Sequence, residues 1–277
     1  MGGWISAVLG GAGDAAATAL LDRVAAWSLR LSHYELDSDL TRLNTNPARA
    51  VRVRPTLAAA LHAAASSRRL SDGLVDVGVL EARRRVEAGE PAVPAGRWSI
   101  TGDVATRPEG TGLDLSGTAK GWLAERALGL PGVAYLPVGL VECDGDIAVH
   151  SDGSIPFAIE IEDPRADDPS TLAPITTLSL PYGQAVRIGI ATSGTYLHRW
   201  GGRGHIVDPA TGEPASAGVV SATGIAPDAI AAEALAKVVV LRGRDAAPML
   251  AAAGATAIAL TDRDTQLRFP GIERWIA

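Results

Sequence analysis

One stretch of the sequence combines a lysine with small residues in a way that suits the binding of an anion. Residues 114–121 read Asp-Leu-Ser-Gly-Thr-Ala-Lys-Gly, and an apolar helix is predicted to begin at Ala119. The small residues let backbone N–H groups approach a negatively charged ligand, and the start of the helix adds positive potential. Lys120, in the first helical turn, would reach a phosphate or a ring carbonyl. The spacing is not that of a P-loop, and an ordinary strand-to-helix turn with a surface lysine is the alternative.

Two further polar segments follow apolar strands. Thr192, Ser193 and Gly194 bring two hydroxyls to the end of a predicted strand, where they can donate to phosphate oxygens. His205 and Asp208 lie in a second segment that ends in a turn. Histidine is the usual acid or base at neutral pH, and aspartate is its usual partner or alternative. Each segment by itself is also typical of a polar turn or a structural histidine.

A fourth candidate is the charged pair Glu233 and Lys237 on a helix predicted over residues 228–241. The two side chains are one helical turn apart and face the same way, an arrangement that is common on helix surfaces. Because the neighbouring residues are nearly all apolar, the pair is either a thin solvated stripe or a buried site. Lys120 and Lys237 are the only lysines among 25 basic residues. An ammonium is a compact point charge and a guanidinium is a planar fork, so each lysine is a candidate for a role that arginine cannot fill.

Hydrophobic periodicity predicts the elements that must position these residues. The pattern predicts one α+β domain over residues 1–277, with a mainly antiparallel sheet and helices to one side. Residues 91–112 are rich in turn formers and predict no long element. The predicted helices cover residues 14–31, 39–44 after a Ser38 cap, 55–69, 119–128, 228–241 and 245–253. The predicted strands cover residues 4–9, 113–115, 135–141, 146–150, 156–162, 174–180, 185–192, 204–207, 217–225, 256–260 and 266–269.

Length and composition exclude several classes of protein. A chain of 277 residues with 47% hydrophobic and 20% charged residues is neither disordered nor too short for a core. The net charge of −6 argues against a general nucleic-acid binder, and no apolar run is long enough to cross a membrane. Cys143 is the only cysteine, which excludes a disulfide within the chain. No signal peptide is evident, and we expect a cytoplasmic protein.

Several short segments share their order with the signatures of a known family. Residues 1–3 look like Met-Gly-Thr, residues 32–34 with 38–44 like Ser-x-Tyr…Ser-Glu-Leu-Ser-x-x-Asn, residues 73–76 like Gly-x-Phe-Asp, residues 114–121 like Asp-Leu-Gly-Gly-x-x-Lys-Gly, residues 192–194 like Thr-Ser-Gly, and residues 205–212 like His-x-x-Asp-Pro-x-Thr-Gly. Together they resemble the FAD:protein FMN transferases, the ApbE flavin transferases, over nearly the whole chain. The resemblance implies an ApbE or T-fold-like α+β fold.

The resemblance also implies an activity. Such enzymes bind FAD and usually a magnesium ion, transfer FMN onto a Thr or Ser hydroxyl of a target protein, and release AMP. Some members instead hydrolyse FAD to FMN and AMP. Both reactions are phosphoryl transfers at the FAD diphosphate, and they differ in whether a protein hydroxyl or water attacks. The expected partners are therefore FAD and an acceptor protein, with no nucleic acid and no membrane.

The matching motifs assign roles to individual residues. Tyr34 and Asp76 would contact the flavin nucleotide. Asp208, or His205 in its place, would be the base for the attacking hydroxyl, and Lys120 would assist catalysis. The remaining nucleotide contacts would come from Ser116, Gly117, Lys120, Thr192, Ser193, Gly194, His205 and Lys237, and the metal ligands would be Glu233 and Gly117.

Some positions depart from the family pattern. The family's last motif is Asp-x-x-x-Thr, whose side chains help to bind magnesium, and here it reads Glu233 and Lys237. Glu233 can still ligate a metal, but an ammonium cannot, and its charge would repel a divalent cation or replace it against the diphosphate. Gly3 replaces a threonine, whereas Asp144 and Ser116 each replace a glycine. A non-catalytic FAD-binding or carrier protein is therefore an alternative to the enzyme.

Overall fold

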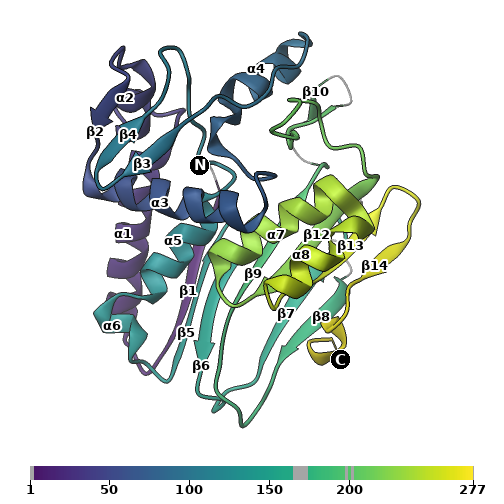
Figure 1. Cartoon of the computed structure of the whole chain (residues 1–277). Helices are drawn as coiled ribbons and strands as arrows, with labels where there is room; N and C mark the ends of the chain where they lie inside the picture. Colours follow the sequence, from purple (N-terminus) through teal and green to yellow (C-terminus); the bar gives the residue numbers. More distant parts are fainter. Residues whose placement is uncertain (1–2, 165–173, 197–198, 201–202, 277) are drawn as a thin grey trace.

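The chain is organised around a large antiparallel sheet (Figure 1). The computed structural model describes residues 3–164, 174–196, 199–200 and 203–276, so Met1 lies outside it. Within those residues, seven strands form the sheet in the order β1-β5-β6-β9-β12-β13-β14, and every neighbouring pair is antiparallel. Its strands are β1 (Ile5–Gly10), β5 (Val138–Cys143), β6 (Asp146–Ser151), β9 (Val186–Gly194), β12 (Val219–Ala226), β13 (Thr256–Thr261) and β14 (Gln266–Arg268).

Helices cover one face of this sheet and a hairpin covers the other. Successive residues of a strand point to opposite faces. Val141 and Ala148 accordingly pack with the helices, whereas Leu140 and Val149 pack with a two-stranded sheet of β7 (Phe157–Glu162) and β8 (Pro174–Leu180). The helices are α1 (Asp14–Leu31), α3 (Pro55–Leu70), α5 (Ala119–Leu128), α7 (Ala229–Arg242) and α8 (Ala247–Ala252). The predicted α+β class with a mainly antiparallel sheet flanked by helices is confirmed.

Helices α5 and α7 and strand β9 pack closely against one another. A Cβ on Gly121 of α5 would lie 2.4 Å from the carbonyl oxygen of Ala229, at the start of α7. A Cβ on Gly189 of β9 would lie 2.1 Å from the backbone nitrogen of the same residue. Only glycine fits at either place, because real Cβ atoms do not approach backbone so closely. Asp228 caps α7 by accepting a hydrogen bond of 2.7 Å from Ala231 N–H. These contacts fix the two helices that carry Lys120, Glu233 and Lys237.

A second, smaller layer lies beyond the large sheet, at the top of Figure 1. Arg107 holds this region together, because its side chain is buried and donates to the carbonyls of Leu43, Asn46 (2.7 Å) and Thr111 (2.9 Å). The elements here are α2 (Asp39–Thr45), the sheet β2-β4-β3 (Ala50–Arg52, Val104–Thr106 and Ser99–Thr101), a 3₁₀ helix (Val77–Val79) and α4 (Leu80–Ala88).

Some local predictions were wrong. Residues 113–115 form no strand, because the Asn44 side chain pairs with both backbone groups of Leu113 at 2.8 Å in place of a neighbouring strand. The strand predicted at 204–207 is reduced to the end of β11 and an isolated bridge at Val207. Residues 91–112 hold no long element, as predicted, but they contain the three-residue strands β3 and β4. The remaining short elements are α6 (Pro131–Ala134), β10 (Arg199–Trp200), β11 (Arg203–Gly204) and 3₁₀ helices at Gly243–Ala246 and Ile272–Arg274. Among the helices of the described residues, none combines the length and apolar character that a bilayer crossing requires.

Candidate functional site

Most of the residues singled out from the sequence meet at one cavity, which Asp208 and Glu233 do not line. It has a volume of about 840 Å³, within the range of sites for small molecules and cofactors. The large sheet, strand β7, the start of α5, α7 and the segment that leads into α4 contribute to its wall. Ten predicted residues line it: Tyr34, Asp76, Ser116, Gly117, Lys120, Thr192, Ser193, Gly194, His205 and Lys237.

The two lysines share a cluster of charges at this wall. Lys120 Nζ lies 3.0 Å from the carbonyl oxygen of Asp144, and 3.7 Å and 3.6 Å from the carboxylates of Asp144 and Asp146. Lys237 Nζ lies 3.4 Å from Glu233 Oε1 and from the carbonyl oxygen of Glu233. The other oxygen of Glu233 accepts a hydrogen bond of 3.0 Å from Gly121 N–H. The pair on α7 is therefore a buried site and not a solvated stripe, since Glu233 is 1% exposed.

Asp146 is a member of this cluster that we did not predict. Its side chain is 1% exposed, and neither carboxylate oxygen has a hydrogen-bond partner among the described residues. Burial raises the pKa of Asp146, and Glu233 raises it further, although Lys120 and Lys237 oppose that shift. Burial alone would lower the pKa of Lys120, but the carboxylates of Asp146, Glu233 and Asp144 raise it above its ordinary value. Lys120 is therefore a permanent cation, held by acidic groups.

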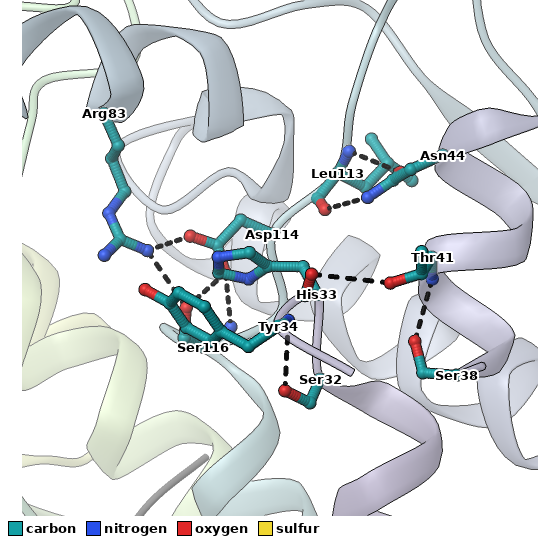
Figure 2. Close-up of polar contacts among 10 residues, drawn as sticks. All are labelled: Ser32, His33, Tyr34, Ser38, Thr41, Asn44, Arg83, Leu113, Asp114 and Ser116. Carbon is teal, nitrogen blue, oxygen red and sulfur yellow. Dashed lines mark hydrogen bonds and ion pairs between the residues drawn. The ribbon is translucent and has the colours of Figure 1, made fainter. Parts of the chain in front are cut away.

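A hydrogen-bonded network fixes the turn before α5 (Figure 2). Asp114 is buried, and its carboxylate accepts from Arg83, from the hydroxyl of Ser116 and from Ser116 N–H at 2.9 Å. His33 Nδ1 lies 3.2 Å from the same carboxylate. Burial and then the charge of Arg83 lower the pKa of His33 to about 4, so the ring is neutral at pH 7.

The same network presents Tyr34 to the cavity. Tyr34 is 69% exposed, and its ring centroid lies 3.9 Å from that of His33. Figure 2 shows the Tyr34 ring beside the guanidinium of Arg83, a residue of α4 that also lines the cavity. Arg83 donates to Ser116 Oγ at 3.0 Å. An exposed aromatic face next to a cation suits a flat heterocycle.

Asp76 also lies at the wall, but its carboxylate is occupied. It accepts from Trp98 Nε1 at 2.6 Å and from Gly78 N–H at 2.8 Å, and it pairs with Arg68 Nε at 3.0 Å. These contacts hold the loop that leads into α4. Asp76 therefore shapes the wall, with most of its acceptor capacity spent on the protein.

Hydroxyl groups from two neighbouring strands form another part of the wall. Thr192 of β9 and Thr223 of β12 are cross-strand partners, and their hydroxyl oxygens lie 2.8 Å apart. Ser193 is 7% exposed, and Tyr196 packs so closely on Gly194 that a Cβ there would lie 2.3 Å from its ring. The glycine of this motif thus makes room for an aromatic ring at the cavity.

The structure separates His205 from Asp208. His205 lines the cavity, but Asp208 does not. The Asp208 carboxylate turns toward Arg242 Nη2 at 2.9 Å and accepts from Ala210 N–H at 2.9 Å. Asp208, the expected base, is thus directed to α7 and away from the cavity. The geometry therefore favours His205 over Asp208 as the acid or base near a ligand.

The residues expected to hold magnesium do not form a suitable set of ligands. Both oxygens of Glu233 are engaged, and Lys237 supplies an ammonium where a ligand oxygen is needed. A Cβ on Gly117 would lie 3.2 Å from Lys237 Cε, so this side chain fills the space beside the other expected ligand. A dication about 4 Å from the ammonium would be repelled by about 8 kcal/mol at an effective dielectric constant of about 20. In the part of the chain that the structure describes, no three His, Cys, Asp or Glu residues are placed to hold a metal ion.

Comparisons with known proteins agree with this architecture. The model of the ApbE family matches residues 1–260. Among solved structures, flavin transferase ApbE from Vibrio cholerae is 22% identical with a TM-score of 0.78, covering 99% of this chain and 96% of that one. The ApbE protein of Thermotoga maritima is 24% identical with a TM-score of 0.76, covering 94% and 90%. The apo form of flavinyl transferase ApbE from Pseudomonas stutzeri is 20% identical with a TM-score of 0.75, covering 95% and 88%. No curated protein matches the chain.

Proposed function

Since the chain belongs to the ApbE family, we propose that it is a flavin transferase that moves FMN from FAD onto a Ser or Thr hydroxyl of an acceptor protein and releases AMP. One observation supports this most strongly. Segments that are far apart in the sequence, and that were chosen for their likeness to the family's motifs, converge on a single cavity of about 840 Å³.

The proposed reaction needs little covalent chemistry from the protein. The acceptor oxygen forms a bond to the phosphorus of the FMN moiety, and the bond from that phosphorus to the AMP phosphate breaks. AMP takes the bonding electrons, and the hydroxyl proton passes to a base. Catalysis of this kind depends on positioning and on neutralising charge. Lys237 would face the diphosphate, and His205 would accept the proton.

Other residues of the cavity would orient the nucleotide. Tyr34 offers an exposed aromatic face on which a flat ring can stack. The hydroxyls of Thr192 and Ser193 can donate to phosphate oxygens or to the polar edge of the flavin. Asp114 and Arg83 would act indirectly, because they hold the turn that carries Gly117.

The test is to incubate the protein with FAD and a Ser/Thr-containing acceptor, and to measure AMP and covalently bound flavin. We expect equal amounts of both products from the wild-type chain, and a strong loss in His205→Ala. His62→Ala is the matched control, because His62 is exposed on α3. AMP with free FMN but no bound flavin would identify a pyrophosphatase instead.

A second function has one observation in its favour. The ammonium of Lys237 stands in the position that the family's metal-binding motif would occupy, and a chain without the metal could retain FAD without turning it over. Tight FAD binding with no AMP under any condition would identify such a carrier. Absence of FAD binding would refute both functions.

A further inference from the structure

We propose that the ammonium of Lys237 is the resident cation of the ligand site, and that this chain binds the diphosphate of a flavin dinucleotide without a divalent metal. This inference rests on the proposed function, and it specifies which group of the site neutralises the negative charge of the diphosphate.

The position of Lys237 is the first support. Its side chain is 15% exposed, lines the cavity and packs against Gly117 in the turn before α5. Several backbone N–H groups of this turn and helix start already donate within the protein, to Asp114, Leu115 and Glu233, so the ammonium supplies a donor that those groups cannot. A partly buried cation at this place can make a charge-assisted hydrogen bond to a phosphate, and such a bond is stronger where water is largely excluded.

The second support is the contrast between the two lysines. Lys120 is surrounded by the carbonyl and carboxylate of Asp144 and by the carboxylate of Asp146. Among the described residues, Lys237 contacts acceptors of Glu233 alone, at 3.4 Å in each case. An ammonium has three donors, so Lys237 retains capacity for a ligand.

The third support is the way in which Glu233 is held. One carboxylate oxygen accepts Gly121 N–H, and the other lies against the ammonium. Glu233 is thus anchored to the start of α5 and directs Lys237 along the cavity wall. In this arrangement Glu233 is a positioning residue for the ammonium.

The experiment measures the affinity for FAD by flavin fluorescence, in EDTA and in magnesium. We expect the wild-type dissociation constant to differ by less than about twofold between the two conditions. Lys237→Met should weaken binding about 10- to 100-fold, since a hydrogen bond to a charged group is lost. Arg244→Met, which removes an exposed cation outside the cavity, should leave the affinity within about twofold.

A second variant guards against misfolding. Lys237→Met alone leaves the buried Glu233 unpaired, whereas Glu233→Gln/Lys237→Met leaves no unpaired charge and keeps an acceptor for Gly121 N–H. This double variant should fold and should still bind FAD weakly. Mn²⁺ added alone to the wild-type chain should show no stoichiometric binding.

The outcomes separate the two proposals. A loss of FAD affinity of about tenfold or more in EDTA, a stoichiometric Mn²⁺ site, or unchanged FAD affinity in the double variant would each overturn the role of Lys237 and leave the flavin site standing. If FAD does not bind in either condition, the proposed function fails and takes this inference with it.

Discussion

His33, a largely buried histidine next to Tyr34, makes the free energy of unfolding fall as the pH is lowered. His33 is 11% exposed, and burial followed by the charge of Arg83 lowers its pKa from 6.5 to about 4. In the unfolded chain the ring recovers its ordinary pKa and binds a proton as the pH falls below 6.5. The unfolded state therefore binds more protons between these two values, and the folded state loses stability as the pH falls through this window.

The size of the effect follows from the shift. At about 1.4 kcal/mol per pKa unit, the full contribution is about 3 kcal/mol, present above the unfolded pKa and lost once the pH is below the folded one. Between about pH 7 and about pH 4.5 the loss should be about 2 kcal/mol.

The assay is urea unfolding at those two pH values, with His33→Asn as the test variant. Asparagine does not titrate, and its amide keeps a polar donor at this position. Other groups titrate in both proteins, so the informative quantity is the difference between them. We expect wild type to lose about 2 kcal/mol more than His33→Asn on acidification, and His62→Asn, changed at an exposed site, to behave as wild type. An equal loss in wild type and His33→Asn would refute the reasoning.

Three further changes test other parts of the structure. Gly3→Thr should destabilise the fold by about 1–3 kcal/mol, because a Cβ there would lie 2.1 Å from Asp144 Cγ. Adding Asp144→Gly should restore most of the lost stability. If the two losses are additive in a double-mutant cycle of unfolding free energies, the contact does not exist. Arg107→Met should cost about 2–4 kcal/mol, since it leaves the carbonyls of Leu43, Asn46 and Thr111 without their buried donor. A change below about 0.5 kcal/mol in the free energy of urea unfolding would show that water replaces the guanidinium. Glu233→Asp with Lys237→Thr restores the family motif and should make FAD affinity sensitive to EDTA, whereas EDTA-insensitive binding in that variant would show that Lys237 is not what excludes the metal.

Long elements with a strong pattern were predictable from the sequence. Helix α5 begins at Ala119 and ends at Leu128 as predicted, and Asp228 caps α7. Helix α7 is apolar on nearly every side, so its alanine-rich composition and the aspartate at its start, not a helical period, indicate it. The sheet β2-β4-β3 was missed because its strands have three residues each, too few for an alternating pattern.

The site was predictable where a motif places a side chain directly. Arg83 was missed because it begins a run of three arginines that is typical of a solvated helix, and only the structure shows that it reaches Asp114. Asp146 was missed because an aspartate directly after an Asp-Gly turn is common at the exposed start of a strand. Its burial depends on the packing of α5 and α7 against β6, which the sequence does not show. Asp208 was wrongly expected at the cavity, because residue spacing does not give the direction in which a turn points a side chain. Its carboxylate is oriented by Arg242, which lies 34 residues later in α7.

The contact between Gly3 and Asp144 was also not predictable from the sequence. Each position departs from the family pattern, and the sequence offers no link between them. In the structure the Asp144 side chain fills the space that a side chain at position 3 would need. Asp144 adopts a φ of 51°, which its short side chain tolerates in a tight hairpin turn before Gly145.

A crystal structure of the complex with FAD would test the central claim most directly. We expect one FAD in the cavity, with its diphosphate within hydrogen-bonding distance of Lys237 Nζ, its flavin near Tyr34 and no metal ion between Glu233 and the phosphates. FAD bound elsewhere, or a metal ion ligated by Glu233 with Lys237 turned away, would contradict it.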